Sequence, residues 1–191
     1  MPKSTLLDQR SLLIKERSGL LAGTDTCDLL DPSNLRPVGM VAHESAPLSN
    51  HLRPVVGARR VTTVLNVYDP GVSLPLLSVR RKSALKGGGL EIQGAGGQVL
   101  ATARVETWSL GAGFDFLDGF GHRLGAMKGD WKHGTFSFNL TGGKVLGVIT
   151  RPESGPGSVT VSLHPDCDHP RGMALLLGAA LGLDLAARTR R

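Results

Sequence analysis

The middle of the chain alternates apolar and polar residues in a unit that occurs three times. The unit opens with an apolar-polar-apolar triplet, which is Leu90-Glu91-Ile92, then Phe114-Asp115-Phe116, then Phe136-Ser137-Phe138. Such a period of two is typical of a strand with one buried face. Seven residues after its start each copy has a glycine, and three residues later a leucine: Gly97 and Leu100, Gly121 and Leu124, Gly143 and Leu146. Each copy therefore predicts a hairpin with a tight, glycine-containing turn.

Two looser copies precede these three, at 27–41 and 65–79. Five hairpins supply ten strands, and the alternating segments 11–15 and 158–163 raise the number to about twelve. We therefore predict a mainly β fold of about twelve antiparallel strands.

The C-terminal region changes from alternation to an unbroken apolar run, Met173 to Leu183. Asp168 is placed to cap a helix there, and Pro170 suits its first turn. A helix that is apolar all round must be buried on every side or lie in lipid. Some 15 residues reach only about 22 Å, short of the roughly 30 Å hydrocarbon layer, so no transmembrane helix is expected. We predict instead that the strands close into a barrel around this central helix.

Small residues recur at every fourth position of that helix, at Ala174, Gly178, Gly182 and Ala186. Each interior glycine lowers helix stability by about 1 kcal/mol relative to alanine. This stripe predicts that backbone of the wall, or of a partner, approaches the helix closely.

The whole chain, 1–191, is expected to form one domain, with an irregular loop at 43–60 as its one long interruption. Cys27 and Cys167 are predicted to be reduced, and the polar start carries no apolar segment typical of a signal peptide. Lys and Arg outnumber Asp and Glu by 22 to 16, with a pI near 9.8. That excess favours lipid headgroups or nucleic acid as partners, although it is also common in proteins without a polyanionic partner.

The predicted arrangement resembles the phospholipid scramblase and LURP-one-related proteins over roughly 11–187. The resemblance is carried by Cys27-Asp28-Leu29-Leu30-Asp31-Pro32, by the later hairpins, by 161–166, and by the ending Leu183-Asp184-Leu185. It implies the tubby-like fold, a twelve-stranded barrel around a C-terminal helix. It does not extend to acylation or calcium binding, because a cysteine run is lacking and 155–160 contains no carboxylate.

The chain shows no motif for catalysis. A phosphate-binding glycine loop and a nucleophile elbow are both missing, so we expect a protein that is not an enzyme and has no cofactor. The cluster His164, Asp166, Cys167, Asp168 and His169 has metal-capable side chains but no standard zinc spacing. A strand-to-helix turn explains it better, and no metal site is predicted.

Basic residues gather where successive strands are expected to end on one rim of the barrel. The candidate headgroup-binding residues are Arg80, Arg81, Lys82, Lys86, Lys128 and Lys132. The resemblance and the charge together suggest non-catalytic binding of anionic phospholipid, by a cytoplasmic protein peripheral to the inner membrane surface. The alternative is a regulatory or structural protein-interaction module with the 43–60 loop as its contact. Nucleic-acid binding ranks third, since few aromatic residues are available for stacking on bases.

Overall fold

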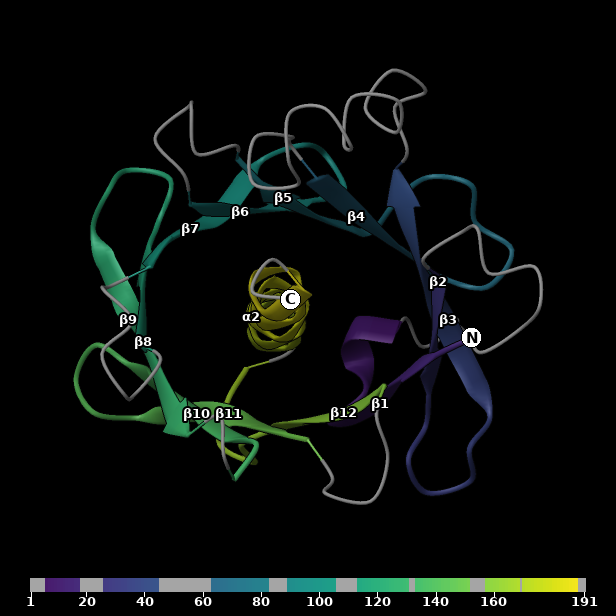
Figure 1. Cartoon of the computed structure of the whole chain (residues 1–191). Helices are drawn as coiled ribbons and strands as arrows, with labels where there is room; N and C mark the ends of the chain where they lie inside the picture. Colours follow the sequence, from purple (N-terminus) through teal and green to yellow (C-terminus); the bar gives the residue numbers. More distant parts are fainter. Residues whose placement is uncertain are drawn as a thin grey trace.

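Twelve antiparallel strands form a closed barrel, and one long helix runs along its axis (Figure 1). This computed structural model describes residues 6–17, 26–44, 63–82, 89–105, 113–130, 133–151, 157–168 and 170–188. The strands are β1 Ser11–Glu16, β2 Thr26–Leu30, β3 Pro37–Glu44, β4 Thr63–Tyr68, β5 Leu77–Arg81, β6 Leu90–Gly94, β7 Val99–Val105, β8 Gly113–Leu117, β9 Arg123–Asp130, β10 Thr135–Leu140, β11 Val145–Thr150 and β12 Ser158–Leu163. A short 3-10 helix, η1 (Leu6–Asp8), precedes them, and α2 (Arg171–Arg188) follows.

The predicted mainly β fold is confirmed, with a closed barrel around the C-terminal helix. Each strand pairs with its neighbours in sequence, and β1 pairs with both β2 and β12. In the closing pair, Leu12 lies opposite Val161 and Ile14 opposite Val159. Because this pairing leaves no free edge in the barrel, every strand is hydrogen-bonded on both sides.

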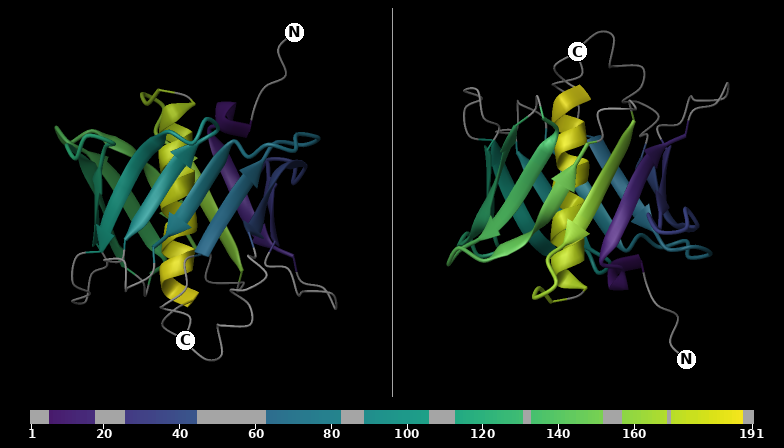
Figure 2. Two further views of the ribbon diagram at one scale, coloured as in Figure 1. Left: turned by 90° about the horizontal axis from the view of Figure 1, so that it is seen from above. Right: turned by 90° about the horizontal axis from the view of Figure 1, so that it is seen from below.

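The two ends of the barrel differ in what they carry (Figure 2). Odd-numbered strands all run in one direction, because neighbouring strands are antiparallel. We call the end where they begin the turn end: it holds the short turns 31–36, 69–76, 95–98, 118–122 and 141–144, and the start of α2. The opposite end, where odd strands and α2 finish, is the helix-exit end. An ion pair between Arg151 and Asp184, 3.6 Å apart, joins wall and helix there.

The prediction of an irregular loop at 43–60 places the start of that loop two residues too early. Residues His43 and Glu44 are the last two residues of β3 and pair with Leu65 and Val64 of β4. The sequence pattern does not reveal this end of β3. His43 occupies an inward-facing position, as Val41 does, but it is polar and so breaks the apolar alternation. The remainder of the predicted loop lies outside the described residues.

The helix begins close to where the sequence predicted, but its start is held differently. Two bonds of the first turn run to backbone carbonyls: the Gly172 amide donates to Asp168 and the Ala174 amide to Pro170. In the described chain the Asp168 carboxylate accepts no hydrogen bond, so the predicted side-chain cap is not formed.

The space between helix and wall is filled unevenly around the barrel. Helix α2 packs against β5 and β6 on one side, against β11 and β12 on another, and against η1. Towards β8 and β10 the gap is filled by four buried phenylalanines, Phe114, Phe116, Phe136 and Phe138. The rings of Phe116 and Phe138 stack with centroids 4.6 Å apart. Four of the five phenylalanines in the chain therefore serve as spacers on one side of the barrel.

The stripe of small helix residues does mark a close approach, but side chains of the wall make it. A Cβ atom at Gly178 would lie 2.7 Å from Ile92 Cδ1, and one at Gly182 would lie 2.7 Å from Leu90 Cδ2. The prediction that backbone fills this space is thus wrong at these two positions. The two glycines leave room for the large aliphatic side chains of Leu90 and Ile92 from β6, which pack directly against the helix.

This packing predicts whether a single substitution raises or lowers the free energy of unfolding. Gly178→Ala removes a helix-propensity penalty of about 1 kcal/mol. It also forces a methyl group against the branched Ile92 side chain, and such overpacking costs about 1–3 kcal/mol. We expect a net loss of about 1 kcal/mol in the free energy of unfolding, measured by urea denaturation. Gly172→Ala is the control, because a Cβ atom at Gly172 would lie 3.1 Å from Leu163 Cδ1, which is a weaker clash than the one at Gly178. A Gly178→Ala protein more stable than wild type would contradict the account.

Candidate functional site

The predicted basic residues of β5 lie at the helix-exit end but do not share one face. Arg80 faces outwards, opposite Val64 and Glu91 on the neighbouring strands. Arg81 occupies an inward-facing position, half-buried, opposite Thr63 and Leu90. Because side chains alternate between the two faces of a strand, Arg80 and Arg81 point to opposite sides of the wall. Only Arg80 and the exposed Lys82 belong to the outer surface.

Lys128 lies on the outer surface of β9, four strands further around the barrel. At about 4.8 Å per strand, this separates it from β5 by about 19 Å along the wall. It lies opposite Gly113 and Ser137, so its direct cross-strand neighbours are uncharged. The remaining candidates, Lys86 and Lys132, lie outside the described residues. The structure thus places the described candidates on one rim without joining them into a single patch.

A carboxylate partly neutralises the β5 cations. Lys82 Nζ lies 2.8 Å from Glu91 Oε2, and the Gln93 side-chain amide donates to Glu91 Oε1 at 2.6 Å. The hydrogen bond from Lys82 holds the pKa of the Glu91 carboxyl below its usual value, against partial burial, with smaller contributions from Gln93 and Arg80. Arg80 is consequently the more available of the two outer cations on this strand.

Charge is distributed unequally between the two ends. The described residues include six carboxylates at each end, and Asp115 lies between the ends. The difference in net charge between the ends therefore depends on the described cations. Five lie at the turn end: Arg10, Arg36, Arg123, Lys144 and Arg171. Eight of the cationic residues whose side chains the structure describes lie at or near the helix-exit end: Lys15, Arg17, Arg80, Arg81, Lys82, Arg104, Lys128 and Arg151. The positive excess therefore belongs to the helix-exit side of the fold.

The metal-capable cluster after β12 does not converge on one point in its described part. The Cys167 thiol is buried and donates to the Val145 carbonyl at 3.2 Å. The His164 ring lies 3.7 Å from the Asp166 carboxylate, on the exposed side of the turn. Among the described residues no group of three such side chains is arranged to hold a metal ion.

The turn end has a property that the sequence patterns did not predict, an apolar surface. Every large hydrophobic side chain that is exposed in the described chain lies on a turn here or next to one: Leu35, Val72, Leu74, Val99 and Phe120. Phe120 is 90% exposed and Leu74 is 74% exposed. A signal was present in Asp118-Gly119-Phe120-Gly121, where an aromatic residue occupies a turn that does not need one. Exposed apolar side chains on four neighbouring turns make this end of the barrel a candidate binding surface.

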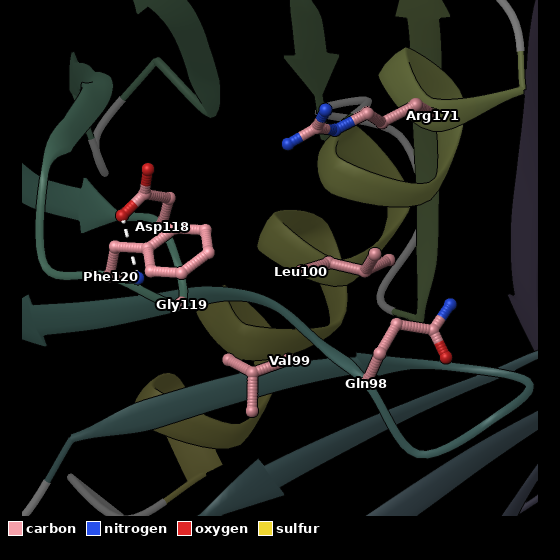
Figure 3. Close-up of a pocket in the computed structure, with 7 residues that line it drawn as sticks. All are labelled: Gln98, Val99, Leu100, Asp118, Gly119, Phe120 and Arg171. Carbon is pink, nitrogen blue, oxygen red and sulfur yellow. Dashed lines mark hydrogen bonds between the residues drawn. The ribbon is translucent and has the colours of Figure 1, made fainter.

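A pocket of about 430 Å³ opens beside Phe120 at the turn end (Figure 3). Its lining comes from the β6–β7 turn and the start of β7, from the β8–β9 turn, and from the first residue of α2: Gln98, Val99, Leu100, Asp118, Gly119, Phe120 and Arg171. None of these residues was a predicted site. Arg171 is distant from the others in sequence, and only closure of the barrel around the helix brings it near them.

Asp118 fixes the shape of the turn on one side of this pocket. Its Oδ1 accepts hydrogen bonds from the Phe120 amide at 2.9 Å and the His122 amide at 2.8 Å. Desolvation raises the pKa of the Asp118 carboxyl, but these two amides and the nearby His122 ring outweigh it, so the pKa lies below its usual value. The carboxylate is therefore ionised near neutral pH and is engaged mainly with its own turn.

Comparison with known proteins adds no relative to this description: the chain matches no family model, no curated protein and no solved structure. Within the described residues, no helix is both long and apolar enough to cross a membrane. The class established here is structural, a closed twelve-stranded antiparallel barrel around a C-terminal helix.

The Glu91 ion pair predicts a small stability term that depends on pH. Glu91→Gln should lower the free energy of unfolding near neutral pH by no more than about 1 kcal/mol, since Lys82 is half exposed. The folded pKa is depressed, so this contribution is complete above the ordinary glutamate pKa of about 4.3 and is lost as pH falls through the folded value.

Urea denaturation at neutral and acidic pH measures this term, with Asp168→Asn as the control, because the Asp168 side chain has no partner among the described residues. A difference between Glu91→Gln and wild type that is unchanged in acid would show that the pair does not stabilise the fold.

Proposed function

We propose that this protein binds anionic phospholipid at a membrane surface without catalysis, through the helix-exit end of its barrel. The observation that carries the proposal is the unequal charge of the two ends, with the cation excess on the helix-exit side. Basic residues near an anionic surface each contribute about 1 kcal/mol to binding. Arg80 and Lys128 face outwards there and are the described candidates with the most accessible charge.

The closed barrel supports a surface role over transfer of lipid across the bilayer. The wall covers the helix over residues 172–183, all of which are buried. A helix in that position offers lipid no apolar path. Relationship to the scramblase and LURP-one-related proteins, and an intracellular location at the inner membrane surface, are part of the same proposal and rest on the sequence resemblance.

Vesicle co-sedimentation tests the proposal. Vesicles of phosphatidylcholine with phosphatidylserine should bind the protein at low salt, and vesicles of phosphatidylcholine alone should not. Replacing Arg80 and Lys128 together by Gln should weaken binding roughly 30-fold, from about 1 kcal/mol at each position. Raising the salt concentration should weaken it further by screening.

The matched control removes the same charge from the other end, by Arg36→Gln with Arg123→Gln. It should bind like wild type. Equal loss in both double variants would mean that net charge alone governs binding, and no binding of wild type to the anionic vesicles at low salt would remove the proposal.

A second candidate, a protein-interaction module, is favoured by the exposed apolar side chains of the β2–β3 and β4–β5 turns. Leu35, Val72 and Leu74 lie on adjacent hairpins at the turn end, away from the cation excess. A protein partner would then contact these turns rather than the predicted 43–60 loop. Cross-linking of the wild-type protein and of Leu35→Ser with Leu74→Ser, in native lysate, should show a species that is lost in the variant.

A further inference from the structure

The pocket at the turn end combines an unpaired cation with apolar walls. Arg171 is exposed, and in the described chain its guanidinium has neither a hydrogen-bond acceptor nor an ion-pair partner. In Figure 3 it points across the opening towards the turn that carries Asp118 and Phe120. Guanidinium groups bind carboxylate and phosphate through parallel hydrogen bonds, and no described residue of this chain occupies the donors of Arg171.

The remaining lining is mostly apolar and incompletely covered. Val99 is 37% exposed, Phe120 is 90% exposed, and Leu100 is half-buried between them and the core. The volume of about 430 Å³ lies in the range of small-molecule sites. An apolar chain placed against these three side chains would bury apolar surface that the fold leaves exposed to water.

Asp118 limits the charge that such a ligand can carry. Its carboxylate also lines the pocket and is held ionised by two backbone amides. One cation and one fixed carboxylate suit a ligand with a single negative charge, placed at Arg171 and away from Asp118. Nucleotides and polyphosphorylated headgroups bring several negative charges and would be repelled.

We infer that this pocket binds a singly charged anionic amphiphile, with its carboxylate or phosphodiester at Arg171 and its apolar chain along Val99, Leu100 and Phe120. The site is at the opposite end of the barrel from the proposed membrane contact, so either can fail without the other. Two sources share this chemistry: a free fatty acid and the headgroup region of a monoanionic phospholipid.

Titration calorimetry on the full chain tests the inference with decanoate and with dihexanoyl-phosphatidylglycerol, each below its micelle concentration. Binding of decanoate alone assigns a free fatty acid, and binding of the phospholipid alone assigns a lipid headgroup. Decanol, which has the chain without the charge, should bind much more weakly than decanoate. Backbone amide shifts on titration should be largest at 98–100 and 118–120. Failure of both anions to bind would overturn the inference.

Two variants separate the contributions of charge and chain. Arg171→Gln should weaken decanoate binding roughly 10- to 100-fold, the factor that a charge-assisted hydrogen bond supplies, and leave decanol binding unchanged. Phe120→Ser should weaken both, and its 90% exposure means that the fold tolerates it. Arg36→Gln and Leu74→Ser make the same changes elsewhere at this end and should bind like wild type. If Arg171→Gln binds decanoate as tightly as wild type, the anion site is not at Arg171.

Discussion

The rest of the structure depends on one constraint: an apolar helix with no polar face has to be covered on every side. The buried run from Gly172 to Leu183 cannot lie on a sheet, because a sheet covers one face only. A barrel satisfies it, and the pairing of β1 with β12 closes that barrel. The barrel is wider than the helix, so the wall reaches it through Leu90 and Ile92 on one side and through four phenylalanines on another. Glycines on the helix and large residues on the wall are two parts of one solution.

The same constraint gives the ends of the barrel different character. The helix enters at the end with the short turns and finishes at the other, so its first residue, Arg171, meets the hairpin turns. Charge and apolar exposure are also divided between the ends: the cation excess lies where the helix exits, and the exposed apolar side chains lie where it enters. The two proposed binding surfaces therefore lie at opposite ends of one barrel, which would let the protein contact a membrane surface while its small-molecule pocket stays open.

Hairpins and helix were predictable because each is specified by neighbouring residues. A period of two, a glycine at a fixed distance and a following leucine define a hairpin locally, as in the copies from Leu90, Phe114 and Phe136. The end of β3 was missed because His43 breaks the apolar pattern while keeping the strand's register. Arg81 was grouped with Arg80, although one step along a strand reverses the side chain. The pocket was out of reach for a different reason: Phe120 and Arg171 are brought together only by closure of the barrel, which no local pattern encodes.

Hydrogen exchange tests most directly whether the helix is a permanent part of the core. Amide exchange should be followed along α2 and along β6 and β11, in the free protein and with anionic vesicles. If the helix stays enclosed, its amides exchange as slowly as those strands, through global unfolding, in both conditions. Exchange of α2 that is much faster than that of the strands, in either condition, would mean that the helix leaves the barrel and would contradict the account.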